Sequence, residues 1–323
     1  MRVVLCYDLK ERHVREIRAV APSADVFAAQ QETIARELLE ADIFCGHAKV
    51  PVDWDEVVRR GRLRWIQSSA AGLDHCLVPS VVASDIVVTS ASGVLADQVA
   101  EHTLALVTAL CRGLPKFFRA QQARQFVRLP TRDLHDATVG IVGFGGVGRR
   151  VAELLRPFRA RMLATDWFPV DEPDYVESLW PPERLFDLLG EIDILILAAP
   201  LTDSTRGMID RQALSLMKST ALLINVARGP LVVERDLVDA LKSSQIAGAA
   251  LDVTEVEPLP NSSELWDLPN CIITPHVGGQ CARRADNMTR FFCENLARYL
   301  SGEPLWNLVD KSLGFPSPLS RRR

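Results

Sequence analysis

The sequence predicts an α/β protein built from two parallel-sheet domains. Short strand-like runs alternate with helical patterns along residues 1–100, and the same alternation restarts at Thr138 after a polar stretch. Strands interleaved with helices are typical of parallel sheets. The length of 323 residues and an apolar fraction of 48% are enough for two buried cores.

The first series contains four strand-like runs, which are VVLCYDL, DIFCGH, LRWIQSS and DIVVTSAS. Helical patterns lie between them, in ETIARELLEA and WDEVVRRG. A long helix is predicted to begin near Asp97, because DQVAEHTLALVTALCRGL has apolar residues at intervals of three and four. Pro115 and the polar run KFFRAQQARQF follow it, and LPTRDLHD is expected to form a loop.

The second series contains six strand-like runs, which begin at Val139, Met162, Ile194, Leu222, Ala249 and Ile272. Six strands form the dinucleotide-binding fold that consists of two mononucleotide-binding halves. A last helical pattern, NMTRFFCENLARYLSG, comes after this domain is complete, so we expect it to pack back on the first domain. The first domain would then be discontinuous, with residues 1–100 and 288–323, and the second would span 101–287.

Three glycines form a GxGxxG pattern between a strand and a helix, in TVGIVGFGGVGRRVAELL. Gly143 permits the tight turn, Gly145 lets the backbone approach a pyrophosphate, and Gly148 lets the helix pack close to the strand. The amides of Gly146 and Val147 would lie near the phosphates at the helix N-terminus. This context predicts a Rossmann-type cofactor cradle.

Asp166 ends the second strand of this domain, 18 residues after Gly148. A carboxylate at this distance accepts hydrogen bonds from the ribose hydroxyls of NAD and repels the 2′-phosphate of NADP. No arginine occurs in the following residues, DWFPVDEP, so NAD is predicted over NADP. The alternative is that Asp166 is only a turn residue at the end of a strand.

Composition and charge exclude several classes of protein. The net charge of −4 gives no electrostatic basis for binding nucleic acid or an anionic membrane. The basic run Arg321, Arg322 and Arg323 is expected to be a solvated tail. The seven cysteines form no CxxC pair, and most lie in apolar runs, which indicates buried free thiols and a reducing compartment. We therefore expect a cytoplasmic protein, with no signal peptide, membrane span or metal site.

Four polar residues follow predicted strands of the second domain, namely Arg228, Asp252, Glu257 and His276. Ligands bind outside the carboxyl ends of the strands in open α/β sheets. Each residue alone has an ordinary explanation as a solvated, loop or turn side chain. Together, a cation, a carboxylate and an imidazole can hold an anionic substrate and move a proton on and off its oxygen.

Several segments resemble the signature segments of the D-isomer-specific 2-hydroxyacid dehydrogenases. They are NVARGPLV, ALDVTEVEPLP, TPHVGG, the glycine segment, PLTDSTRGMID and WIQSSAAGLD. The resemblance extends over nearly the whole chain. It implies two Rossmann-like domains with a cleft between them, a homodimer, and NAD(P)-linked interconversion of 2-oxo acids and D-2-hydroxy acids.

The resemblance also implies roles for individual residues. His276 matches the proton donor, Glu257 its carboxylate partner, and Arg228 the residue that binds the substrate carboxylate and carbonyl oxygen. Backbone amides near Ala71 and Gly72 match a second clamp on the carboxylate. Asp252 matches a residue near the nicotinamide carboxamide. The other positions expected to line the cofactor are Pro200, Thr205, Val226, Ala227, Arg228 and His276.

Glu257 favours a reaction on a 2-oxo acid. The formate dehydrogenase relatives, which have no proton to move, carry an amide at the matching position. We expect a small unphosphorylated 2-oxo acid of the glyoxylate or hydroxypyruvate type. The alternative is a dimeric, NAD-sensing binding protein, corepressor-like, on the same fold. Four positions depart from the family pattern and bear on substrate range, namely Asp97, Gln98, Gln280 and Cys281.

Overall fold

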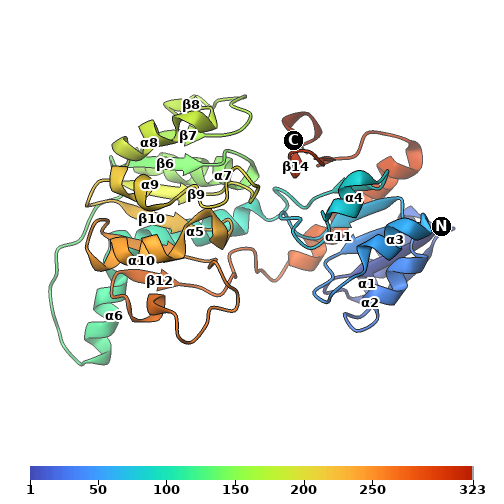
Figure 1. Cartoon of the computed structure of the whole chain (residues 1–323), viewed down its shortest axis with the longest axis horizontal. Coiled ribbons are helices and arrows are strands. Elements are labelled where there is room, and N and C mark those ends of the chain that lie inside the picture. Colours follow the sequence, from blue (N-terminus) through green and yellow to red (C-terminus); the bar gives the residue numbers. More distant parts are fainter. Residues whose placement is uncertain (322–323) are drawn as a thin grey trace. The chain divides into compact units, whose positions relative to one another are not determined.

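The computed structural model describes residues 1–321, so Arg322 and Arg323 of the predicted tail lie outside the described residues. The chain divides into two compact units, whose elements are labelled in Figure 1. Unit 1 comprises Met1–Leu95 and the segment from Cys281 onward, and unit 2 comprises Ala96–Gln280. Unit 2 is thus a continuous piece of chain inserted into unit 1.

Unit 1 contains a five-stranded parallel sheet with the strand order β2-β1-β3-β4-β5. The strands are β1 (Arg2–Cys6), β2 (Asp25–Ala28), β3 (Ile43–Gly46), β4 (Trp65–Ser68) and β5 (Val87–Thr89). The sequence predicted four of them and missed β2. This strand lies at the edge of the sheet, and Val26 is its one buried residue, so it has no apolar run to reveal it.

The helices of unit 1 cover its sheet. They are α1 (Glu11–Val20), α2 (Ile34–Glu37), α3 (Trp54–Arg60), α4 (Pro79–Ala83) and α11 (Arg284–Ser301). Helix α11 contacts α1, and its Phe292 and Leu296 share a buried core with Trp65 of β4. The rings of Trp65 and Phe292 are 5.5 Å apart. The C-terminal helix therefore completes the core of unit 1, as predicted. A short antiparallel pair, β13 (Val309–Asp310) and β14 (Phe315–Pro316), follows it.

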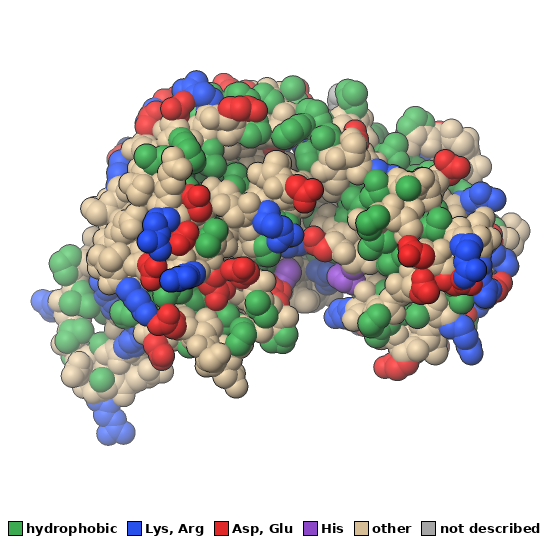
Figure 2. Space-filling model, in the orientation of Figure 1, with side chains coloured by type: hydrophobic (Ala, Val, Ile, Leu, Met, Phe, Trp, Pro, Cys, Tyr) green, Lys and Arg blue, Asp and Glu red, His purple; other side chains and the backbone are tan. Residues whose placement is uncertain are grey.

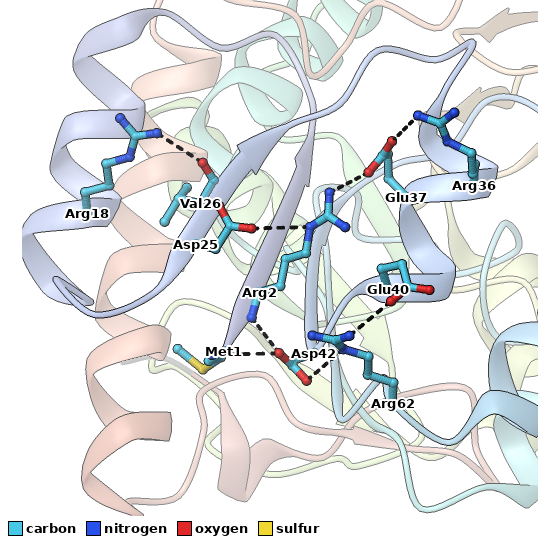
Figure 3. Close-up of polar contacts among 10 residues, drawn as sticks. All are labelled: Met1, Arg2, Arg18, Asp25, Val26, Arg36, Glu37, Glu40, Asp42 and Arg62. Carbon is cyan, nitrogen blue, oxygen red and sulfur yellow. Dashed lines mark hydrogen bonds and ion pairs between the residues drawn. The ribbon is translucent and has the colours of Figure 1, made fainter.

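Arg2 joins three elements at the amino end of the unit 1 sheet (Figure 3). Its guanidinium donates to Glu37 at 2.6 Å and lies 3.6 Å from the carboxylate of Asp25. Its backbone N–H donates to Asp42 at 2.5 Å. Glu37 also accepts from Arg36 at 3.0 Å. The hydrogen bond from Arg36, supported by Arg2 and opposed by burial of the carboxylate, lowers the pKa of Glu37 from its ordinary value of 4.5.

Replacing Glu37 with Gln is expected to lower the free energy of unfolding by about 1–2 kcal/mol near neutral pH, because the partly buried Arg2 loses a charged partner. A lowered folded-state pKa stabilises the protein above the unfolded value, and this contribution is lost as pH falls through the folded value. The difference from wild type should therefore shrink below about pH 4.5. Urea unfolding at several pH values measures it. The exposed Glu40, replaced in the same way, is the control and should change stability less.

Unit 2 contains a seven-stranded parallel sheet with the order β12-β11-β10-β9-β6-β7-β8. The strands are β6 (Thr138–Val142), β7 (Arg161–Thr165), β8 (Ser178–Trp180), β9 (Ile194–Leu197), β10 (Leu222–Asn225), β11 (Gly248–Leu251) and β12 (Cys271–Ile273). The sequence predicted six strands and missed β8, which has three residues and lies at the edge of the sheet.

Helices cover both faces of this sheet (Figure 1). Side chains of α8 (Leu185–Glu191), α9 (Arg211–Leu216) and α10 (Glu234–Lys242) share one core with one face of the strands. Those of α5 (Ala96–Cys111) and α7 (Gly146–Leu155) share a second core with the other face. Two apolar faces explain why these strands are nearly continuous runs of Val, Ile and Leu.

A helix that the sequence did not predict, α6 (Leu114–Gln122), occupies part of the polar run after α5. Gly113 is left-handed and ends α5, and Pro115 lies at the start of α6, where proline is tolerated. Helix α6 has no buried residues, so the sequence lacks the apolar spacing that marks a packed helix.

The seven cysteines are free, and five of them are buried. Burial raises the pKa of Cys76 and of Cys271 to about 12. On the face drawn in Figure 2, basic and acidic side chains are interspersed, with no large area of one sign. Within residues 1–321, no helix has both the length and the apolar character needed to cross a membrane.

Candidate active site

The three residues expected to carry the chemistry follow three adjacent strands of unit 2. Arg228 follows β10, Glu257 follows β11 and His276 follows β12. Because β10, β11 and β12 are parallel neighbours, their carboxyl ends lie at the same edge of the sheet. The fold therefore brings the three loops together from positions up to about fifty residues apart in the chain.

His276 and Glu257 are in direct contact. The imidazole Nδ1 lies 2.8 Å from Glu257 Oε2, and the side chains are 48% and 39% exposed. The other carboxylate oxygen, Oε1, accepts from the backbone N–H of Thr254 at 3.2 Å. Glu257 is thus fixed by its own loop and in turn orients the ring. Because Nδ1 is engaged, Nε2 is the ring nitrogen left to face a ligand.

The Arg228 loop is shaped by Asn225, a fully buried residue that sequence reasoning did not single out. Its amide donates to the carbonyl of Arg228 at 2.9 Å, and its amide oxygen accepts from the N–H of Ala227 at 3.1 Å. Arg228 donates to the carbonyl of Ala227 at 2.7 Å. A Cβ on Gly229 would lie 1.9 Å from the carbonyl of Thr254, so this loop packs against the loop that carries Glu257.

Asp252 lies at the end of β11 and is 3% exposed. Its carboxylate accepts from the backbone N–H groups of Val277 and Gly278, each at 2.9 Å. It therefore faces the loop of His276. His102 of α5 lies 3.2 Å from the same carboxylate and was not predicted as part of the site.

The glycine motif forms the turn from β6 into α7, beside the carboxyl end of β9. A Cβ on Gly143, whose φ is +90°, would lie 2.5 Å from the backbone of Ala199, and one on Gly148 would lie 2.1 Å from the carbonyl of Gly143. These two glycines are therefore required by packing. A Cβ on Gly145 would have nothing within 4 Å.

The open space at Gly145 lies at the N-terminus of α7, where no side chain caps the helix. Gly146 and Val147 form the first turn of α7, so their N–H groups are at the helix end that attracts phosphates. The strand order reverses between β6 and β9, which is the switch point where ligands bind in doubly wound sheets. The residues present thus fit a dinucleotide pyrophosphate.

Asp166 follows β7 and faces the glycine turn. One carboxylate oxygen accepts from the N–H of Phe144 at 2.6 Å, and the other accepts from the N–H of Phe168 at 2.9 Å. These bonds fix a negative charge beside the turn. The nearby cation Arg149 donates to the carbonyls of Val170 and Asp171, each at 2.6 Å.

Other positions expected to line the cofactor follow neighbouring strands. Pro200 and Thr205 share a turn after β9, in which the Thr205 hydroxyl donates to the Pro200 carbonyl at 2.8 Å. Val226 and the buried Ala227 lie between β10 and Arg228. These residues and the glycine turn occupy the carboxyl ends of adjacent strands.

The two residues of the predicted carboxylate clamp belong to unit 1. Ala71, which is exposed, and Gly72 lie in the turn after β4. The hydroxyl of Ser68 accepts from the N–H of Ala70 at 3.0 Å and so shapes the start of this turn. His47 and His75 flank it with their rings stacked 3.9 Å apart, a pair that sequence reasoning did not single out.

The four positions that depart from the family pattern lie near the ends of unit 2. Asp97 pairs with Arg150 at 2.7 Å, and the side-chain oxygen of Gln98 is buried without a protein hydrogen-bond partner among the described residues. Gln280 ends unit 2, and Cys281 begins the second part of unit 1. The effect of these four residues on substrate range stays a prediction.

A doubly wound sheet, a phosphate-binding glycine turn and an imidazole–carboxylate pair at the same edge define a nucleotide-dependent oxidoreductase. The sequence matches the model of the D-isomer specific 2-hydroxyacid dehydrogenase NAD-binding domain over residues 104–278. The chain belongs to the D-isomer specific 2-hydroxyacid dehydrogenase family. It is a D-2-hydroxyacid dehydrogenase and binds its nucleotide, NAD(P), on unit 2.

Similar proteins extend this match to both units. A glyoxylate reductase of Thermococcus kodakarensis is 34% identical over 293 residues, which cover 88% of this chain and 87% of that protein. The human glyoxylate reductase/hydroxypyruvate reductase is 32% identical over 305 residues, or 89% and 92% of the two chains. A Xanthobacter autotrophicus D-isomer specific 2-hydroxyacid dehydrogenase, solved with NADPH and MES, superposes with a TM-score of 0.83 at 28% identity, covering 97% and 99%.

Replacing Gly145 with Ala is expected to weaken NADH binding by about 10-fold or more while the fold remains intact, because the methyl group would occupy space kept for the pyrophosphate. Fluorescence titration with NADH measures the effect, and circular dichroism checks the fold. Gly190 in α8 is exposed, and a Cβ added there would also have nothing within 4 Å, so Gly190→Ala is the matched control. Equal NADH affinity in the two variants would contradict this role of Gly145.

Proposed function

We propose that this protein reduces a small 2-oxo acid, of the glyoxylate or hydroxypyruvate type, to the D-2-hydroxy acid, with His276 as the proton donor. Bound NADH supplies the hydride that adds to the carbonyl carbon of the substrate. The observation that supports this proposal most directly is the contact between His276 Nδ1 and Glu257 Oε2 at 2.8 Å. The substrate type is suggested by the glyoxylate and glyoxylate/hydroxypyruvate reductases to which the chain is similar.

In this mechanism His276 delivers a proton from Nε2 to the carbonyl oxygen as negative charge develops on it. Glu257 holds the opposite side of the ring through Nδ1 and so orients Nε2 for the transfer. After the proton has left, the same contact keeps the neutral ring in place for reprotonation. The balance is one hydride to carbon and one proton to oxygen, which converts the carbonyl group to an alcohol.

Arg228 is proposed to bind the substrate carboxylate and the carbonyl oxygen. Its guanidinium offers a planar set of N–H donors that suits a carboxylate, and a positive charge near the carbonyl oxygen stabilises the transition state. Asn225 and the close packing at Gly229 fix the loop that carries it. The backbone amides near Ala71 and Gly72 are also proposed to bind the substrate carboxylate, with unit 1 as the substrate-binding domain.

The test is NADH oxidation with a panel of 2-oxo acids that includes glyoxylate, hydroxypyruvate, pyruvate and longer homologues. We expect turnover with at least one small unphosphorylated acid, and the D configuration wherever the product is chiral. Binding of NADH without turnover of any panel member would favour the alternative, an NAD-sensing binding protein on the same fold.

The proposed cofactor is NAD, on the basis of the fixed carboxylate of Asp166 and the engagement of Arg149 with backbone carbonyls. The similar Xanthobacter autotrophicus structure holds NADPH, so the preference has to be decided by residues of this chain. A carboxylate at the ribose position repels a 2′-phosphate, which is why this residue decides the preference.

Replacing Asp166 with Ser is expected to shift the ratio of kcat/KM for NADH over NADPH toward NADPH by about 10–100-fold, because a charge repulsion is removed and a ribose partner is lost. Steady-state kinetics with both nucleotides measure this ratio. Asp174 is a carboxylate of the same loop, and Asp174→Asn should leave the ratio unchanged. A ratio that stays constant in Asp166→Ser would rule out Asp166 as the selective residue.

A homodimer in the cytoplasm is the proposed state of the protein. In Figure 1, α6 and the segment after it form an arm at the periphery of unit 2, and Arg119 of α6 donates to the carbonyls of Leu268 and Pro269. This arm exposes apolar side chains, with Phe118 57%, Phe126 97%, Val127 42% and Leu129 41% accessible. Exposed apolar groups gathered on one arm favour burial against a second copy. Light scattering after size-exclusion chromatography tests the dimer.

A further inference from the structure

The loop that carries His276 has a backbone conformation that its own sequence does not favour. His276 has a φ of +52°, in the left-handed region that disfavours residues with a Cβ. Pro275, Val277 and Gly278 surround it in a short connection from β12. Contacts with the rest of the structure must therefore hold His276 in this conformation. Three consecutive backbone N–H groups of the loop make these contacts.

The N–H groups of His276, Val277 and Gly278 all donate to Asp252. The first bonds its backbone carbonyl at 2.8 Å, and the other two bond Oδ1 and Oδ2 of its carboxylate, each at 2.9 Å. Asp252 is 3% exposed, so little water competes for these bonds. A Cβ on Gly278 would lie 2.9 Å from Oδ2, which leaves no room for a side chain there. Asp252 thus acts as a template around which the loop is wrapped.

Two side chains fix this template. The Thr274 hydroxyl lies 2.6 Å from Asp252 Oδ1 and donates its one proton to the carboxylate. His102 Nε2 lies 3.0 Å from the same hydroxyl and 3.2 Å from Oδ1. The Thr274 hydroxyl donates its one hydrogen bond to Asp252, so its oxygen and Asp252 Oδ1 can both only accept from the His102 ring. His102 Nε2 therefore carries a hydrogen. The imidazole thereby completes the set of donors around the buried carboxylate.

The members of this set come from distant parts of unit 2. His102 belongs to α5, its first helix, whereas Thr274 belongs to the last loop before Gln280, the final residue of the unit. The contact between them spans 172 residues of sequence. Helix α5 is packed in a core of unit 2, so it offers a rigid support for a loop that is otherwise exposed at His276.

We propose that His102, acting through Thr274 and Asp252, is a positioning residue that holds the loop of His276 in the conformation in which His276 meets Glu257. The expected effect on the reaction rate rests on the proposed function. The expected effect on the position of the His276 imidazole rests on geometry alone. In this proposal the Asp252 carboxylate supports the loop of His276, because both of its oxygens accept hydrogen bonds from that loop.

The test compares variants that remove a hydrogen bond with variants that keep it. Thr274→Val removes the hydroxyl and keeps the shape, whereas Thr274→Ser keeps the hydroxyl. His102→Leu removes the donor, whereas Gln in His102→Gln can place an N–H near the position of Nε2. His135 is exposed and comes just before β6, at the amino end of that strand, so His135→Leu is the control for loss of a histidine.

The first readout does not depend on turnover. The chain has six histidines, so ¹⁵N-histidine NMR can follow each imidazole, with His276 assigned from the His276→Ala spectrum. We expect Thr274→Val and His102→Leu to shift or broaden the His276 resonances, and Thr274→Ser, His102→Gln and His135→Leu to remain close to wild type. Unchanged His276 resonances in both Thr274→Val and His102→Leu would overturn the proposal, whether or not the wild type turns over any substrate.

The second readout is kinetic. In Thr274→Val and His102→Leu, kcat should fall by about 10-fold or more with little change in the Kd for NADH, and Thr274→Ser should recover most of the rate. In the His276→Ala background, Thr274→Val should cause no further loss, because both changes act through one group. An equal loss in both backgrounds would mean that Thr274 acts elsewhere and would overturn the role. Thr274→Val and His102→Leu change different residues, so if one variant does not fold, the other still tests the proposal.

Discussion

Replacing His276 with Ala is expected to lower kcat by about 10²–10⁴-fold, the range for loss of a positioned general acid. The affinity for NADH should change little, because the residues proposed to cradle the pyrophosphate lie at the turn between β6 and α7. Stopped-flow or steady-state measurement of NADH oxidation gives the rate, and fluorescence titration gives the affinity. A variant that keeps more than about a tenth of the wild-type kcat would remove His276 as the proton donor.

Glu257→Gln separates the charge of the carboxylate from its geometry. The amide can still contact Nδ1 of His276, but it carries no negative charge. We expect a smaller fall in kcat than in His276→Ala, because the imidazole is still present and still held through Nδ1. In a His276→Ala background the Glu257→Gln change should have little further effect, since the two residues act as one unit.

Replacing Arg228 with Lys is expected to reduce kcat/KM for the 2-oxo acid by about 10²–10³-fold, even though the positive charge remains. A lysine presents a point charge and lacks the planar pair of donors that matches a carboxylate. Both KM and kcat should change, because the proposed contacts include the substrate carboxylate and the carbonyl oxygen. Retention of wild-type kcat/KM would show that the guanidinium does not contact the substrate.

A matched control for this change exists on the same unit. Arg211, the first residue of α9, is exposed and pairs with Asp236 and Asp239, so carboxylates of its own surface already engage its guanidinium. Arg211→Lys should leave kcat/KM unchanged. The comparison separates loss of a specific donor arrangement from a general response to Arg-to-Lys replacement.

The sequence was sufficient for the parts of the fold that depend on long apolar runs and on glycine. The central strands of unit 2 are buried on both faces, so they appear as uninterrupted runs, and the GxGxxG segment forms the expected strand-turn-helix. The edge strands β2 and β8 were missed because each has one buried residue, which leaves no pattern to detect. Helix α6 was missed because it has no buried face.

For the candidate site, the sequence could predict which side chains lie at one edge of the sheet, whereas their roles stay predictions. Side chains that follow adjacent parallel strands can be assigned to one edge, which is how Arg228, Glu257 and His276 were selected. Asn225 and His102 could not be found in this way. Asn225 is part of an apolar strand, and His102 is one residue in a helical pattern, so their importance appears only when hydrogen-bond partners are known.

The insertion of unit 2 into unit 1 has a consequence for the order in which the protein folds during synthesis. Chains emerge from the ribosome N-terminus first, so unit 2 is a complete segment before α11 exists. Until then the Trp65 side of the unit 1 sheet is covered only in part, by α1, since Phe292 and Leu296 are made nearly two hundred residues after Leu95. Unit 2 can reach its native state on the ribosome, whereas unit 1 closes its core only after α11 has been made.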